Sequence, residues 1–109
     1  MSDAIPTIAK AARLIATKRL SPVELTRACL ERVHALDNRL HAFVHLTEER
    51  ALAEARAAET AIMARGPSGP LHGIPIGLKD IVDTKGIPTT CGSKLLQENI
   101  PAADATCAE

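Results

Sequence analysis

The sequence has almost no aromatic side chains. Phe43 is its single aromatic residue, and both tryptophan and tyrosine are absent. Much of the hydrophobic content is alanine, which buries little area per residue. A chain of 109 residues with this composition can form one small domain at most, and by itself only a thin core.

The sequence also has no excess of positive or negative charge. Thirteen Lys and Arg residues balance thirteen Asp and Glu residues, and no run of like charge occurs. This balance argues against nucleic acid or an anionic membrane as a direct partner, because both need a basic patch. No hydrophobic run approaches the roughly 20 residues of a membrane span. The first residues also lack the basic and apolar regions of a signal peptide.

Disulfide chemistry is not indicated. Cys29, Cys91 and Cys107 are odd in number and far apart, and no Cys-x-x-Cys pair occurs. This pattern is typical of reduced thiols and predicts a cytoplasmic protein.

The first two-thirds of the chain has the pattern of three helices, at about residues 7–19, 22–36 and 47–65. Thr7 is the expected cap of the first helix, and Ser21 followed by Pro22 is a strong start for the second. Asp37 and Asn38 are expected to end that second helix. Small apolar residues at helical spacing follow in the third helix, where they suit close packing: Ala51, Ala55, Ala58 and Ile62.

After the loop at 66–70 the pattern changes. Ile74 to Leu78 is apolar apart from Gly77 and is bounded by turn-forming residues, which predicts a buried strand over about 74–79. Lys79 stands at its end. From the residues alone, the simpler interpretation is an ion pair with Asp80 or Asp83. The alternative is an ammonium group held in a cleft for chemistry.

Other candidate sites have weaker support. Cys91 could act as a nucleophile with His72 as its base, although a small buried thiol is the simpler interpretation. His41 and His45 are spaced like a zinc-binding pair, but a third ligand is not evident. Three serines are poor candidates for a nucleophile, since they are expected in a cap, a loop and a scaffold turn: Ser21, Ser68 and Ser93.

Several motifs, in order along nearly the whole chain, resemble the amidase signature family. They are the helix start at Leu20 to Leu25, the strand ending in Leu78-Lys79-Asp80, the block Thr89-Thr90-Cys91-Gly92-Ser93, and Pro101 to Thr106. The resemblance implies an α/β fold, in which a mixed sheet is flanked by helices. Residues 1–109 would form the N-terminal part of a single amidase domain, with the first helices and first core strand, so the fold is incomplete in this chain.

The resemblance also implies a Ser–cis-Ser–Lys mechanism on a small-molecule amide, without metal or organic cofactor. Lys79 matches the catalytic lysine of the family. Both serines lie downstream in the family, in or near a Gly-Gly-Ser-Ser-Gly-Gly-type segment that this chain lacks. We therefore expect residues 1–109 alone to be inactive.

Two identities within the family remain open, and a third interpretation lies outside it. We favour a general amidase, which could be a homodimer. The alternative is the A subunit of glutamyl-tRNA amidotransferase, a glutaminase that supplies ammonia to partner subunits. The segment from Thr84 to Lys94 is similar to that subunit, whereas Ile81-Val82 replaces the Asn-Ile usual there. Outside the family, the chain could be a helical interaction module or the product of a disrupted gene. In every case the exposed apolar strand predicts an isolated chain that is poorly stable and prone to aggregate.

Overall fold

A computed structural model describes residues 4–109, which divide into two compact units at the bond between Pro75 and Ile76. The first unit contains three α-helices: α1 (Ile8–Ala16), α2 (Pro22–Leu40) and α3 (Glu48–Arg65). The second unit contains two short 3-10 helices, η1 (Lys94–Leu96) and η2 (Thr106–Ala108), joined by turns. None of the helices in the described residues is long and apolar enough to cross a membrane.

Side-chain capping fixes where the first two helices begin, as the sequence predicts. Thr7 Oγ1 accepts a hydrogen bond from Lys10 N (3.2 Å). Ser21 Oγ accepts from Val23 N and Glu24 N, at 3.0 and 3.4 Å. These bonds satisfy amide groups that have no partner within the first helical turn.

Helix α2 extends one turn further than the sequence predicts. Asp37 does not end it, because the helix continues to Leu40 and closes at His41, whose φ is 50°. The Asp37 carboxylate instead accepts hydrogen bonds from Ala42 N (2.7 Å) and Phe43 N (3.2 Å). An aspartate can therefore stabilise the chain just beyond a helix end while remaining helical itself.

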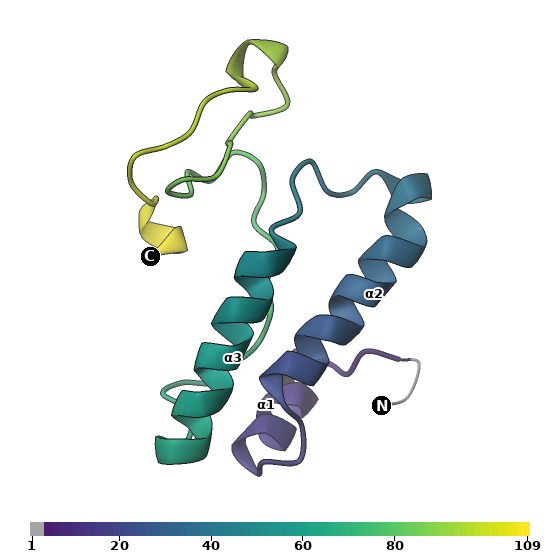
Figure 1. Cartoon of the computed structure of the whole chain (residues 1–109), viewed down its shortest axis with the longest axis vertical. Coiled ribbons are helices and arrows are strands. Elements are labelled where there is room, and N and C mark those ends of the chain that lie inside the picture. The colour runs from purple at the N-terminus through teal and green to yellow at the C-terminus, as the bar shows by residue number, and fades with distance from the viewer. Residues whose placement is uncertain (1–3) are drawn as a thin grey trace. The chain divides into compact units, whose positions relative to one another are not determined.

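The core of the first unit lies where the three helices meet. Helices α2 and α3 run antiparallel and pack along each other (Figure 1). The buried cluster is formed by Ala11, Ile15, Leu20, Leu25 and Ile62. Ala55 is buried and Ala58 packs against this cluster, so the predicted stripe of small residues on α3 does face the interior. Ile8, the first residue of α1, is 59% exposed.

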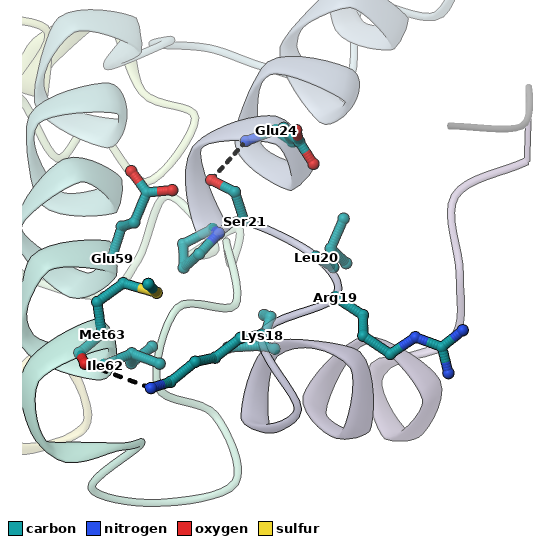
Figure 2. A pocket seen from close by; sticks show the side chains of 10 residues that line it. Lys18, Arg19, Leu20, Ser21, Glu24, Glu59, Ile62 and Met63 are labelled. Atoms are coloured by element: carbon teal, nitrogen blue, oxygen red, sulfur yellow. Dashed lines mark hydrogen bonds between the residues drawn. The ribbon is translucent and has the colours of Figure 1, made fainter.

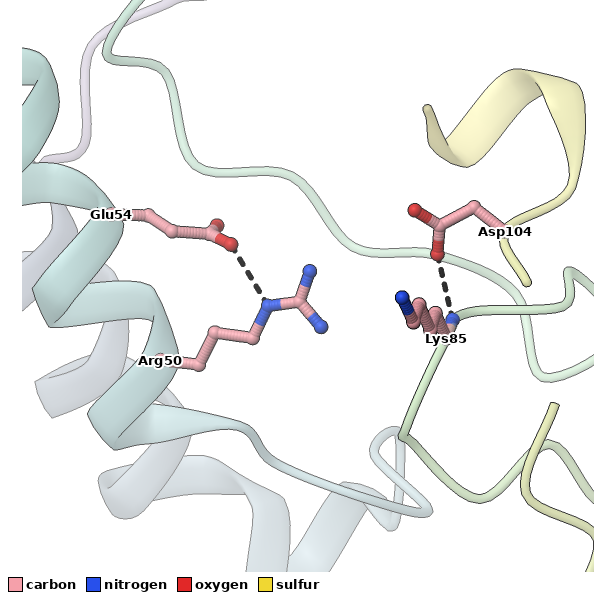
Figure 3. A network of polar contacts seen from close by, with 4 residues as sticks. All are labelled: Arg50, Glu54, Lys85 and Asp104. Carbon is pink, nitrogen blue, oxygen red and sulfur yellow. Dashed lines mark hydrogen bonds and ion pairs between the residues drawn. The ribbon is translucent and has the colours of Figure 1, made fainter. Parts of the chain in front are cut away.

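Backbone hydrogen bonds between distant residues organise the second unit. Asp83 O accepts from Ala105 N (2.8 Å), and Gly86 N donates to Pro101 O (3.0 Å). The amide of Lys85 donates to the carboxylate of Asp104 at 2.7 Å (Figure 3). These bonds hold a segment without regular strands in a defined conformation.

The strand predicted at 74–79 is not present in the described part of the chain. Residues 74–79 have no regular secondary structure, and no described segment pairs with them as a neighbouring strand. A strand requires such a neighbour, because its backbone groups are otherwise unpaired. The helical part of the expected fold is confirmed, whereas the first strand is not.

Candidate functional site

Lys79 lies at the start of a tight turn in the second unit. Its carbonyl oxygen accepts a hydrogen bond from Val82 N at 3.0 Å. Its side chain is exposed, and among residues 4–109 the Nζ atom has no hydrogen-bond or ion-pair partner. The ion pair with Asp80 or Asp83 that the residues alone favoured is therefore absent from the described chain.

Asp80 is instead bonded to a segment ten residues further on. Its Oδ1 atom accepts from Thr90 N (2.8 Å), and its Oδ2 atom accepts a short hydrogen bond from Thr90 Oγ1. Its carbonyl oxygen accepts from Cys91 N (2.8 Å). Three hydrogen bonds thus connect Asp80, the residue after Lys79, to Thr90 and Cys91. Both carboxylate oxygens of Asp80 have a hydrogen-bond partner without the lysine.

These contacts stabilise the charged form of Asp80. The hydrogen bond from the Thr90 hydroxyl, followed by that from the Thr90 amide, lowers the pKa of Asp80 below its ordinary value of 3.8. Desolvation opposes this effect, and the Gly92 amide adds to it. A carboxylate that accepts several N–H and O–H bonds is the usual origin of such a shift.

Two hydrogen bonds between Thr89 and Asn99 hold the residue that precedes Thr90. Thr89 N donates to Asn99 O, and Asn99 Nδ2 donates to Thr89 O, both at 2.9 Å. Thr89 and Thr90 are 3% and 8% exposed, the lowest values in the second unit. The partners of Asp80 are therefore well fixed. Sequence reasoning missed this arrangement, because no local pattern indicates a hydrogen bond across ten residues.

The serines take structural roles. Ser21 Oγ caps α2, and Ser93 Oγ accepts from Leu95 N (3.2 Å) at the start of η1. Ser68 donates through its amide to His72 Nδ1 at 3.0 Å, with its hydroxyl 3.2 Å from the same atom. That contact lies in a loop of the first unit and gives His72 a local partner.

The other candidates are not assembled into sites. Cys91 is exposed rather than buried, and its backbone has a φ of 52°. His41 forms the left-handed cap of α2. Within residues 4–109, no group of three or more potential metal-ligating side chains comes together.

A pocket of about 180 Å³ opens in the first unit where the loop between α1 and α2 meets α3 (Figure 2). Two of its polar groups are occupied: Lys18 Nζ donates to Met63 O (3.4 Å), and Ser21 serves as the helix cap. The side chains of Glu24 and Glu59 also line the pocket, whereas Lys79 does not.

Comparison with known proteins identifies the family. The family profile described as Amidase matches residues 24–109. The chain therefore belongs to the amidase family. The matched region contains Lys79 and the Asp80–Thr90 contacts.

Relatives within this family are similar over nearly the whole chain. The A subunit of glutamyl-tRNA(Gln) amidotransferase from Streptomyces coelicolor is 49% identical over 97% of this chain and 22% of its own length. Its counterpart of the same name from Acidothermus cellulolyticus is 46% identical over 97% of this chain and 21% of its own length. The chain thus spans about one fifth of the curated relatives it matches.

A solved structure shares the fold of this segment. It is described as a vestigial protein complex that reveals the evolutionary origins of an s-triazine catabolic enzyme. It matches with a TM-score of 0.84 and 33% identity, over 92% of this chain and 22% of that chain. The fold of this chain is therefore similar to that of part of a known structure.

Proposed function

We propose that the protein containing this segment hydrolyses a carboxamide, or transfers its acyl group, with Lys79 as the catalytic base. One observation carries the proposal: the Lys79 ammonium has no partner in the described chain, although a carboxylate follows it directly in sequence. A lysine held in an ion pair would be a poor base, because the pair stabilises the protonated, charged form. Membership of the amidase family supports the same role.

The mechanism is the one that the family resemblance implies. The lysine removes a proton from a bridging serine held by a cis peptide bond, and that serine activates the nucleophilic serine. The nucleophile attacks the amide carbonyl, and backbone N–H groups stabilise the oxyanion. The C–N bond then breaks, ammonia or an amine leaves with the proton returned through the bridging serine, and water hydrolyses the acyl ester on the nucleophilic serine. Lys79 is the one member of this triad assigned to the chain, which covers about one fifth of its relatives. Residues 1–109 alone are therefore expected to be inactive.

Lys79 is exposed in this segment, whereas a lysine that acts as a base is usually buried, because burial disfavours the charged ammonium form. We infer that segments equivalent to the remaining four fifths of the relatives cover Lys79 in the active enzyme.

The second candidate is the A subunit of a glutamyl-tRNA amidotransferase. Its support is the 46–49% identity to curated proteins of that name over 97% of the chain. In this case the carboxamide would be glutamine, and partner subunits would be required. The replacement at Ile81 and Val82 still favours a general amidase. Both candidates would use the same chemistry and would differ in their substrate.

A grafted enzyme tests the proposal. In it, residues 1–109 replace the matching fifth of the Streptomyces coelicolor relative, which supplies the remaining four fifths. Release of ammonia is measured with glutamine and with small amides such as acetamide. Lys79→Met should lower kcat about 1,000-fold or more, as for loss of a member of a catalytic triad. Lys85→Met is the matched control, since the hydrogen bond to Asp104 uses the Lys85 backbone amide and survives the change.

The substrate profile of the full-length protein distinguishes the two candidates, because in the grafted enzyme the amidotransferase relative supplies four fifths of the chain. Turnover of glutamine but not acetamide would favour the amidotransferase, and the opposite preference a general amidase. Undiminished activity of Lys79→Met in the grafted enzyme would refute the role of Lys79.

A further inference from the structure

The backbone around Lys79 is fixed from one side only. Among residues 75–79, one group takes part in a hydrogen bond. It is the Lys79 carbonyl, which accepts from Val82 N. The preceding apolar residues Ile76 and Leu78 are 69% and 44% exposed, so packing within the described chain does not hold them either. The conformation of Lys79 therefore depends on the residues C-terminal to it.

Asp80, the next residue, is attached at three points. The Thr90 amide and hydroxyl each bond one carboxylate oxygen, and the Cys91 amide bonds the carbonyl oxygen. The peptide group between Lys79 and Asp80 is restrained from two sides. Its carbonyl oxygen accepts a hydrogen bond from Val82 N, and Asp80, whose nitrogen completes the group, is attached to Thr90 and Cys91. This restraint limits the position of the Lys79 Cα atom, from which the side chain extends.

The attachment has a second consequence. A carboxylate next to a lysine would otherwise be a convenient counter-ion. Both oxygens of Asp80 instead face donors from Thr90, and the Gly92 amide donates to the Thr90 hydroxyl (3.3 Å), which holds that hydroxyl in place. These contacts direct both Asp80 oxygens towards Thr90, and Lys79 and Asp80 form no ion pair.

We propose that Asp80 is a positioning residue, which orients Lys79 through its hydrogen bonds to Thr90 and Cys91. This role rests on the proposed function of Lys79. It does not require Asp80 to touch the substrate. It assigns to Thr90 the task of fixing Asp80.

The first test uses the 109-residue chain itself. Amide hydrogen exchange is measured by NMR for Thr90 and Cys91. We expect protection of about tenfold or more in the wild type and its loss in Asp80→Ala, because the hydrogen bonds that protect these amides are removed or loosened. Asp83→Ala is the matched control: Asp83 bonds to Ala105 through its carbonyl, which the substitution leaves in place. Unprotected Thr90 and Cys91 amides in the wild type, or unchanged protection in Asp80→Ala, would overturn the proposal.

The second test uses the grafted enzyme. Asp80→Ala should lower kcat about tenfold or more and change KM by less than about threefold, since orientation of a base acts on the chemical step. Thr90→Val should lower kcat in the same way, and Thr90→Ser should restore it because the hydroxyl is retained. Should Asp80→Ala fail to fold, the Thr90 pair decides, because it leaves Asp80 itself in place.

The outcomes separate this proposal from the previous one. If Lys79→Met is inactive while Asp80→Ala and Thr90→Val keep a kcat within about twofold of the wild type, Asp80 has no positioning role although Lys79 is catalytic. If Lys79→Met is active, the catalytic role of Lys79 fails, and the positioning role of Asp80 fails with it. A fall in kcat that Thr90→Ser reverses supports both.

Discussion

Gly73 lies directly against the ring of Pro22, the first residue of α2. A Cβ atom added at Gly73 would lie 2.8 Å from Pro22 Cγ and 3.3 Å from Ile62 Cδ1, and the φ of Gly73 is +85°. Both the contact and the backbone conformation exclude a larger residue. Gly73→Ala is therefore expected to destabilise the first unit by about 1–3 kcal/mol.

The measurement is urea unfolding followed by far-ultraviolet circular dichroism. Gly69→Ala is the matched control in the same loop, because an added Cβ there meets no atom within 4 Å and its φ lies outside the left-handed region. Equal midpoints for the two variants would contradict the close approach of Gly73 to α2.

The core of the first unit makes a second prediction. Ile15 is 2% exposed, and Ile8 on the same helix is 59% exposed. Ile15→Ala should lower the free energy of unfolding by about 2–5 kcal/mol, because it removes buried methyl groups and leaves a cavity. Ile8→Ala should change it by less than about 0.5 kcal/mol. The same unfolding experiment compares the two, and a larger effect at Ile8 would show that the helix faces are wrongly assigned.

Local signals in the sequence were sufficient for the helices. Caps at Thr7 and Ser21 are formed by the residue itself and the amides two or three positions later, so their partners can be read directly. An ion pair between Arg50 and Glu54 forms at 2.8 Å, because i and i+4 positions adjoin on any helix (Figure 3). The predicted end of α2 was wrong, since Asp37 favours the end of a helix without requiring it.

Partners far along the sequence could not be predicted. The apolar pattern at 74–79 resembles a buried strand, but a strand forms only where a neighbouring strand exists, and no sequence window reveals that neighbour. Lys79 and Asp80 illustrate the same limit. Their adjacency suggested an ion pair, whereas Thr90 captures the carboxylate through a turn whose closure depends on Asn99 as well.

Exposed apolar side chains in the second unit predict self-association of the isolated chain. Ile76 is 69% exposed, Ile81 57% and Leu95 95%. Large exposed apolar residues promote association, and an added charge opposes it. A triple substitution of these residues by glutamate should lower the light scattering of the 109-residue chain on concentration. Glutamate at the exposed Ala57, Ala102 and Ala103, which adds the same charge without removing a large apolar side chain, should lower it less. Equal scattering of the two triple variants would contradict a role for the three apolar side chains.

The three cysteines should differ in reactivity. Cys29 packs against the core of the first unit, and desolvation raises the pKa of its thiol above the ordinary value of 9.0. Cys91 and Cys107 are exposed. Because the thiolate is the reactive form, iodoacetamide should modify Cys91 and Cys107 first at neutral pH, and Cys29 more slowly. Mass spectrometry of the digested chain measures the order, and early modification of Cys29 would contradict its packing.

The Asp80–Thr90 contact predicts a dependence of stability on acid. The pKa of Asp80 is lowered in the folded state by the Thr90 hydroxyl and amide, from an ordinary value of 3.8. The folded state therefore binds this proton more weakly than the unfolded state. The stabilisation is fully present above pH 3.8 and is lost as the pH falls through the lower, folded-state pKa.

A carboxyl carbon titration of Asp80 by NMR should give a midpoint below 3.8. Thr90→Val should raise this midpoint, and Thr90→Ser should leave it low because its hydroxyl can still donate. A wild-type midpoint at or above 3.8 would mean that Thr90 does not hold the carboxylate.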